Sequence, residues 1–225
     1  MARNLTLHRR DAASGTTRSA VLFLHGYGAD GADLLGLADP LSPYLKDTVF
    51  LAPDAPEKCR ANPGGFQWFP IPWLDGSSEA EAAQGQKRAA EDIDALIDKV
   101  LEENAISPER LVVFGFSQGT MMALDVVPRR AQPVAGIVGF SGRLLQPEGF
   151  AARVVSRPPV LLVHGDADDM VPLQYFHEAG RTLQEAGFDV YAHVMKGTGH
   201  GIAPDGLSVA LSFMAERLGV DLPKA

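Results

Sequence analysis

The sequence predicts an α/β protein with a mostly parallel central sheet that is covered by helices on both faces. Apolar runs of strand length, rich in Val, Leu and Phe, recur along the chain, and amphipathic helical patterns separate them. Strands that are buried on both faces give such continuous runs, and alternating strands and helices form parallel sheets. With 225 residues, 46% of them hydrophobic, the chain suits one α/β domain over residues 1–225 and is too short for two.

The expected elements can be placed in order along the chain. The segments with the composition of buried strands are 20–25, 48–52, 111–116, 134–141, 160–164 and 189–195. Helical spacing covers 79–103, 173–186 and 205–217, and a further helix begins near Thr120. The helix over 79–103 has the clearest signals, because Ser78 and Glu81 form a capping-box pair in front of one apolar stripe.

Composition excludes several classes of function. The net charge of −8 at pH 7 argues against nucleic-acid binding. No apolar run approaches the ~20 residues that span a bilayer, so we expect no stable membrane insertion. Residues 1–15 lack the hydrophobic core of a secretory signal, and the one cysteine, Cys59, fits a reducing compartment. We therefore expect a cytoplasmic protein that acts on a small molecule, and a homodimer is compatible with the sequence.

The main chemical signal is the pentapeptide G-x-S-x-G formed by Gly115, Ser117 and Gly119, between a predicted strand and a predicted helix. This pattern is typical of a nucleophile elbow. The chain must reverse within a few residues there, so side chains at the two glycine positions would collide. The serine hydroxyl then lies at a helix N-terminus, where free N–H groups favour developing negative charge. The alternative is a glycine-rich turn with a solvent-facing serine.

A serine nucleophile needs a histidine base and an orienting acid. In α/β-hydrolase sheets these follow the serine in the order acid, then histidine. The acid is expected just after the strand over 160–164, where Asp166, Asp168 and Asp169 are all candidates.

The base must lie beyond that segment, which leaves His177, His193 and His200. His177 lies within an amphipathic helix, and His193 lies in the middle of a strand. His200 lies in a glycine-rich loop that leaves the last strand, so it is the predicted base.

Four ordered segments together resemble the phospholipase/carboxylesterase family, which includes the acyl-protein thioesterases. They are residues 24–31 (LHGYGADG), the elbow, residues 164–172 (HGDADDMVP) and Gly199-His200. The resemblance covers nearly the whole chain and implies an α/β-hydrolase fold, with no cofactor and no metal. The family pattern H-G-x-x-D-x-x-V-P implies Asp168 as the triad acid. The short chain leaves no room for a separate lid domain.

The resemblance also implies an oxyanion hole made by the backbone N–H groups of Tyr27 and Gln118. Many relatives carry leucine at the position of Tyr27. A backbone donor tolerates this change, but we expect the larger ring to narrow the acyl pocket. His25 is expected to order the same loop.

Residues 53–78 form a long segment, rich in Pro and Gly, in which we predict no secondary structure. Loops of this length are usually functional. The family places an aromatic loop over the acyl-binding cleft, which implies that Trp68 and Phe69 line it. The alternative is that these rings fix the loop to the sheet.

We therefore predict a serine carboxylesterase that cleaves carboxylic ester or thioester bonds of small or medium acyl substrates through an acyl-enzyme on Ser117. Lysophospholipase or acyl-protein thioesterase activity is a close alternative. A non-catalytic binding protein on a hydrolase scaffold is another, because a fold does not imply an activity.

Two rival sites can be built from the same motifs. Residues 26–31 match G-x-G-x-x-G after a strand, with Asp54 where a ribose-binding acid would lie, but a dinucleotide site leaves the elbow unexplained. A metal site of His164, Asp166, Asp168 and His200 lacks the spacing of known zinc signatures and leaves the serine unused.

Overall fold

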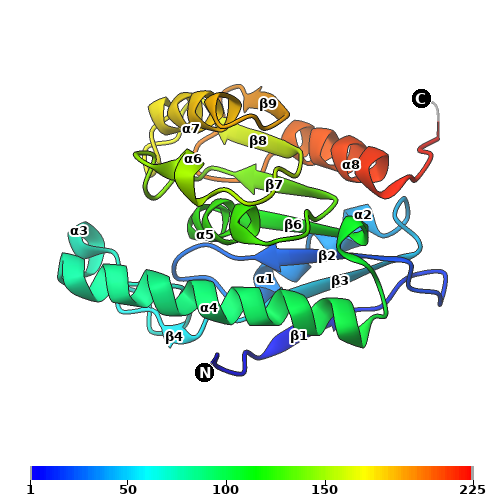
Figure 1. The fold of residues 1–225 in the computed structure, drawn as a ribbon, viewed down its shortest axis with the longest axis horizontal. Coiled ribbons are helices and arrows are strands. Elements are labelled where there is room, and N and C mark those ends of the chain that lie inside the picture. Colours follow the sequence, from blue (N-terminus) through cyan, green and yellow to red (C-terminus); the bar gives the residue numbers. More distant parts are fainter. Residues whose placement is uncertain (1, 224–225) are drawn as a thin grey trace.

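A computed structural model describes residues 2–223 and contains a seven-stranded sheet through the middle of the molecule (Figure 1). The strand order is β1-β3-β2-β6-β7-β8-β9, and every neighbouring pair is parallel except the antiparallel pair of β1 and β3. The strands are β1 (Leu7–Arg10), β2 (Ser19–Leu24), β3 (Thr48–Pro53), β6 (Leu111–Phe116), β7 (Gly136–Phe140), β8 (Val160–Gly165) and β9 (Val190–Met195).

Helices cover both faces of the sheet, and each face has its own apolar core. Side chains along β2 alternate between the two cores, because Leu22 and Leu24 belong to one and Val21 and Phe23 to the other. The first core includes side chains of α4 (Glu79–Glu103), α5 (Gln118–Val126), α6 (Phe150–Arg153) and α7 (Gln174–Glu185). The second includes side chains of α1 (Gly31–Leu35), α2 (Ala38–Leu41) and α8 (Pro204–Leu218).

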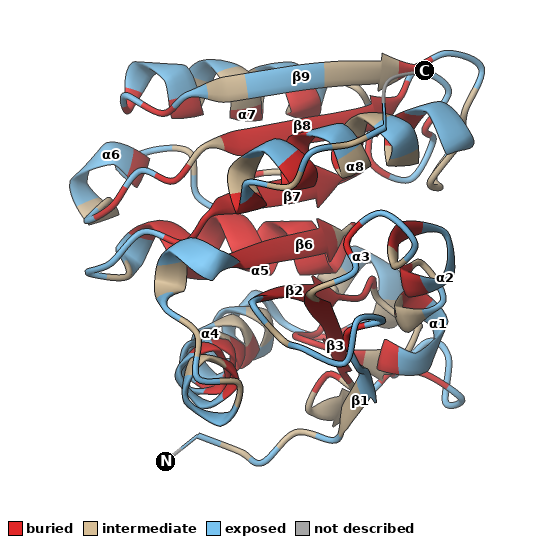
Figure 2. Cartoon of the chain, turned by 90° about the vertical axis from the view of Figure 1, so that its right-hand side faces the viewer, coloured by how far each residue is buried: buried red, intermediate tan, exposed pale blue. Residues whose placement is uncertain are grey.

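Burial follows the position of each strand in the sheet (Figure 2). The strands β2, β3, β7 and β8 are buried along their whole length, whereas β9 is only partly buried because it forms an edge. Two short 3-10 turns, Pro108–Arg110 and Val127–Arg129, flank β6 and α5 in the chain. The predicted α/β architecture, with a mostly parallel sheet between two helical layers, is confirmed.

One expectation at the level of elements was wrong, and one strand was not predicted. Residues 53–78 contain secondary structure: a two-stranded hairpin of β4 (Glu57–Lys58) and β5 (Phe66–Gln67), followed by α3 (Pro72–Asp75). Elements this short have no periodic pattern, so the sequence did not reveal them. The edge strand β1 was also missed, because half of its residues are arginines and its exposed end carries no apolar alternation.

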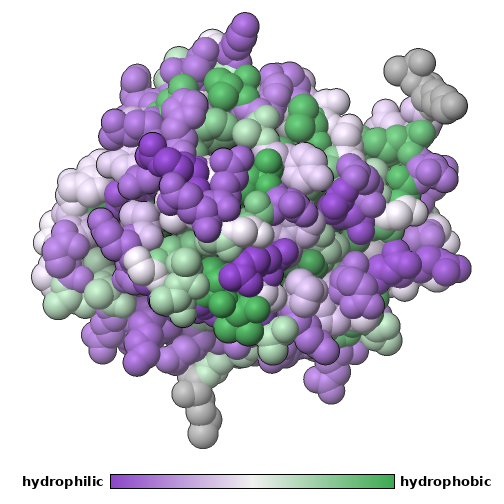
Figure 3. Space-filling view, turned by 45° about the horizontal axis from the view of Figure 1, so that its top comes forward, coloured by the Kyte–Doolittle hydropathy of each residue, from purple (hydrophilic) through white to green (hydrophobic). Residues whose placement is uncertain are grey.

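No helix within residues 2–223 combines the length and the apolar character needed to cross a bilayer. The face shown in Figure 3 carries hydrophilic residues interspersed with small hydrophobic clusters.

Candidate active site

Ser117 lies in the sharp turn between β6 and α5 and has a strained backbone, with φ 53° and ψ −114°. The flanking glycines are required by close packing. A Cβ atom at Gly119 would lie 1.8 Å from the carbonyl oxygen of Leu24, and one at Gly115 would lie 2.4 Å from the backbone nitrogen of Thr120. No side chain fits at either position, so the predicted elbow geometry is confirmed.

His200 and Asp168 meet at the same end of the sheet. The Nδ1 atom of His200 lies 2.8 Å from Oδ2 of Asp168. The two loops that carry them are also joined through backbone, because the N–H of Ala167 donates to the carbonyl of Thr198 at 3.0 Å. A carboxylate accepts hydrogen bonds, so Nδ1 of His200 is the donor in this contact.

Asp168 is almost completely buried, with 6% of its surface exposed, yet it remains an anion. Burial alone would raise the pKa of this carboxyl group. Hydrogen bonds from the Val171 N–H, from His200 and from the Met170 N–H outweigh burial and lower the pKa below its usual value. The neighbouring imidazole of His164 donates to the carbonyl of Val171 at 2.7 Å, and burial lowers its pKa, so it stays neutral.

The other candidates for acid and base lie elsewhere. Asp166 accepts a hydrogen bond from the Gly197 N–H at 2.7 Å and therefore caps the histidine loop. His193 lies 2.8 Å from Asp205, and His177 is exposed on α7. The structure thus brings Asp168, not Asp166, into contact with His200.

Ser117 and His200 both line one cleft of about 540 Å³. The ring of Phe116 packs against the imidazole of His200, with centroids 5.0 Å apart, and so fixes the histidine beside the elbow. Among the hydrogen bonds of the described residues, none joins the Ser117 hydroxyl to His200. Such contacts often form only when substrate binds.

Two residues whose backbone N–H groups have no acceptor among residues 2–223 belong to the lining of the same cleft. They are Tyr27 and Gln118. The loop before Tyr27 lies against the elbow, since a Cβ atom at Gly26 would be 3.3 Å from Cβ of Ser117. His25 orders this loop as expected: its Nδ1 donates to the Gly26 carbonyl at 2.7 Å, and its Nε2 accepts from the Ala55 N–H at 2.9 Å.

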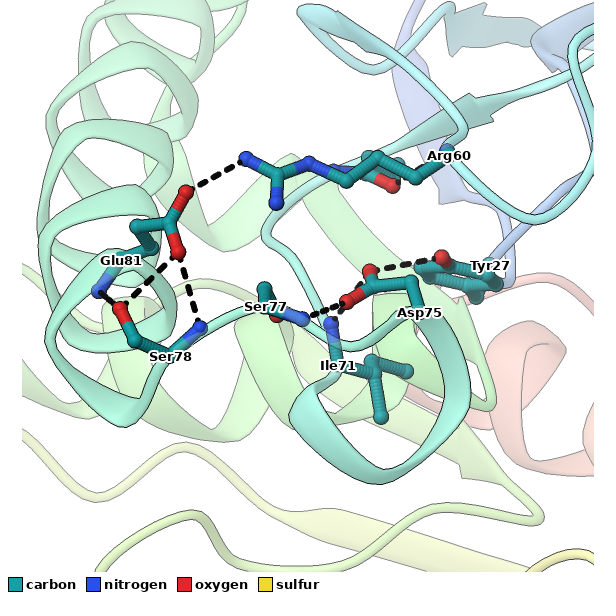
Figure 4. Close-up of polar contacts among 8 residues, drawn as sticks. Tyr27, Arg60, Ile71, Asp75, Ser77, Ser78 and Glu81 are labelled. Carbon is teal, nitrogen blue, oxygen red and sulfur yellow. Dashed lines mark hydrogen bonds and ion pairs between the residues drawn. The ribbon is translucent and has the colours of Figure 1, made fainter.

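The phenol of Tyr27 contacts Asp75 of α3 (Figure 4). Its hydroxyl donates to Asp75 at 2.9 Å, and Asp75 also accepts from the backbone N–H groups of Ile71 and Ser77. Burial would raise the pKa of Asp75, but these hydrogen bonds lower it to about 2. Burial, the neighbouring Cys59 thiol and the hydrogen bond to Asp75 all raise the pKa of Tyr27. The tyrosine therefore joins the loop that follows β2 to the helix that borders the cleft.

The expectation that Trp68 lines the cleft was wrong. Trp68 is fully buried, with 0% of its surface exposed, and its indole donates to the carbonyl of His25 at 2.9 Å. Its backbone N–H donates to the side chain of Gln118, whose amide donates in turn to the carbonyl of Phe69. Trp68 thus fixes the loop to the sheet, which is the alternative predicted from the sequence for the aromatic rings of this loop. Phe69 does line the cleft.

The features behind the rival sites have structural roles. Asp54 accepts from the Gly31 N–H at 3.0 Å and contacts His8 at 3.0 Å, so its carboxylate holds the start of α1. Within residues 2–223, no group of three or more His, Cys, Asp or Glu side chains is arranged to hold a metal ion.

Sequence reasoning missed Arg143, which lines the cleft together with Tyr175. It follows β7, the strand beside the elbow strand, by three residues. A charged residue just past the carboxyl end of a central strand was the signal that could have found it.

The fold and the elbow define an α/β-hydrolase. A model of the phospholipase/carboxylesterase family matches residues 11–218. An acyl-protein thioesterase 1 from Gibberella zeae is 30% identical, over 92% of this chain and 93% of its own. A probable carboxylesterase from Oryza sativa subsp. japonica is 30% identical, over 92% and 80%. The crystal structure of esterase PE8 is 39% identical, with a TM-score of 0.91 over 96% of this chain and 100% of its own.

The chain therefore belongs to the phospholipase/carboxylesterase family. It is a carboxylic ester hydrolase of the serine hydrolase class.

Proposed function

We propose that Ser117, His200 and Asp168 form the catalytic triad of this hydrolase. The observation that carries the proposal is the 2.8 Å contact between His200 and Asp168 beside a cleft that the strained serine also lines. With Nδ1 protonated and held by an anionic carboxylate, Nε2 of His200 is free to accept the proton of the Ser117 hydroxyl.

The reaction has two steps. Ser117 attacks the carbonyl carbon, and the N–H groups of Tyr27 and Gln118 stabilise the tetrahedral oxyanion, each donor contributing about 3 kcal/mol. His200 gives its proton to the leaving alcohol or thiol, and an acyl-enzyme forms. Water, deprotonated by His200, then attacks the acyl-enzyme, and His200 returns the proton to the Ser117 oxygen as the acid leaves.

The substrate class follows from the cleft and from the relatives. A volume of about 540 Å³ lies in the range of small-molecule sites and suits small or medium acyl groups, with Phe69 in contact with the substrate. Relatives named as carboxylesterase and as acyl-protein thioesterase support both esters and thioesters as substrates. We propose a cytoplasmic location, because the one cysteine, Cys59, is buried and free.

The test is the variant Ser117→Ala. We expect kcat for a short-chain 4-nitrophenyl ester to fall by about six orders of magnitude, as for other triad serines. A fluorophosphonate should label the unchanged chain at Ser117 and leave the variant unlabelled. A variant that keeps its turnover contradicts the mechanism. Absence of both turnover and labelling in the unchanged chain supports a non-catalytic binding protein instead.

A further inference from the structure

The cleft contains a positive charge that the reaction described above does not use. Arg143 lines the cleft with Ser117 and His200. Its place is set by tight backbone packing, because a Cβ atom at Gly142 would lie 3.0 Å from the carbonyl oxygen of Ser117. The residue before, Ser141, is buried and has φ 48°. The backbone that carries Arg143 is therefore held directly against the elbow.

Arg143 differs from the other arginines of residues 2–223 in its surroundings. Most of them donate to a carboxylate or to a backbone carbonyl, as Arg60 does to Glu81 and Arg157 does to the carbonyl of Ala186. Arg143 has neither kind of partner within the described residues. Arg88 and Arg181 also have neither, but both are exposed, whereas Arg143 is half-buried.

The contact that the guanidinium of Arg143 does make is with an aromatic ring. Its Cζ atom lies 5.3 Å from the centre of the Tyr175 ring, which also lines the cleft. Such a contact orients the guanidinium but leaves its N–H groups free to donate. A half-buried cation without a counterion gains more from binding an anion than an exposed cation does.

The charges in the cleft favour binding of an anion only beside Arg143. Glu79, at the start of α4, also lines the cleft and would repel a negative group. The whole chain carries a net charge of −8, so long-range attraction does not bring anions to the site. A guanidinium forms two parallel hydrogen bonds with a carboxylate or a phosphate group.

We propose that Arg143 is a specificity-determining residue, which binds a carboxylate or phosphate group carried by the ester substrate while Ser117 attacks the ester carbonyl. This inference rests on the proposed function of the same site. It narrows the substrate class to esters or thioesters with a negatively charged group on the acyl or the leaving part.

The experiment compares matched pairs of esters. The first pair carries the charge on the acyl part: the 4-nitrophenyl monoester of glutaric acid, and 4-nitrophenyl pentanoate with the same carbon chain. The second carries it on the leaving part: the butanoate esters of 4-hydroxybenzoate and 4-hydroxybenzamide. The butanoate of 4-hydroxyphenyl phosphate distinguishes phosphate from carboxylate. The readout is the kcat/KM of each anionic ester divided by that of its neutral partner.

We expect Arg143→Gln to lower this ratio about tenfold or more for at least one pair, since a hydrogen-bonded charge pair is lost. Arg143→Lys keeps the charge but lacks the two parallel N–H donors of the guanidinium, so it should give an intermediate ratio. Arg181→Gln, with the same change of charge on an exposed part of α7, should leave the ratio unchanged. If the ratios in Arg143→Gln are unchanged, the inference is overturned. The proposed function then remains intact, provided that neutral esters are still cleaved and Ser117→Ala is inactive.

A second measurement needs no variant. Glutarate should inhibit neutral-ester turnover competitively in the unchanged chain, more strongly than the neutral diamide of the same acid, and added salt should weaken it. Equal inhibition by the two compounds overturns the inference. Loss of all turnover in the unchanged chain would instead contradict the proposed function.

Discussion

At the scale of single residues, Asp168 shows how a buried carboxylate keeps its charge. Two backbone N–H groups donate to one oxygen, at 2.9 and 2.8 Å, and His200 donates to the other at 2.8 Å. These donors replace the water that burial removes, so the anion remains stable and can hold an imidazole in one tautomer. Asp166, two residues earlier, has no such set of donors and caps a loop instead.

We expect Asp168→Asn to lower kcat about 10⁴-fold, because an amide can leave the imidazole in the wrong tautomer. The measurement is steady-state turnover of a 4-nitrophenyl ester, with circular dichroism to show that the variant is folded. Asp166→Asn is the matched control and should have a far smaller effect. A larger loss in the control than in Asp168→Asn would assign the acid to Asp166.

The scale of elements is best illustrated by α4, which the sequence predicted with its observed ends. Ser78 accepts a hydrogen bond from the Glu81 N–H at 3.2 Å, and the Glu81 carboxylate accepts from the Ser78 N–H at 2.8 Å. Both bonds join residues three apart in the chain. Ile93 and Ile97 lie one turn apart and are fully buried against the sheet. A helix defined by such local contacts is predictable from its own residues.

Ser78→Ala removes the cap of α4. We expect the free energy of unfolding to fall by about 1 kcal/mol, because buried packing remains and one N-terminal N–H loses its acceptor. Denaturation by urea measures the change. Ser208→Ala, at an exposed position inside α8, is the control and should have little effect, since alanine is a good helix former. Equal losses in the two variants would show that the cap contributes nothing specific.

The helix α3 is the opposite case. It has four residues, and contacts with distant parts of the chain hold it: Asp75 accepts from Tyr27, 48 residues away in sequence. No local pattern announces such an element. The ring of Tyr27 therefore anchors the edge of the cleft.

At the scale of the whole molecule, the lowered carboxyl pKa values make stability depend on pH. The pKa of Asp75 is about 2 in the folded chain, against an ordinary value of 3.8. The folded value is the lower one, so this group stabilises the fold fully above its unfolded pKa. That stabilisation is lost as pH falls through the folded pKa. Asp168, whose pKa is also lowered, acts in the same direction.

We expect the free energy of unfolding to decrease as pH falls from about 4 to about 2. Asp75→Asn removes one of the titrating groups, so the difference in stability between the unchanged chain and this variant should shrink across the same window. Chemical denaturation at several pH values measures both curves. A difference that stays constant from neutral pH to about pH 2 would show that Asp75 does not stabilise the fold through its charge.

The sequence by itself determined the alternation of strands and helices, the glycines of the elbow and the order of the motifs that supply Ser117, Asp168 and His200. These follow from contacts between residues close in the chain, or from apolar runs that record burial on both faces. The structure then brought Asp168 and His200 together because parallel strands gather their carboxyl ends at one edge of the sheet.

Only the tertiary structure decided which side chains at the carboxyl edge of the sheet are buried, which act as anchors and which line the cleft. It buried Trp68 against the loop that contains His25, anchored α3 through Tyr27 and left Arg143 in the cleft with no carboxylate partner among residues 2–223. Each of these outcomes depends on the packing of loops that lie far apart in sequence. The free energy of such packing belongs to the folded arrangement and has no counterpart in any local pattern of residues.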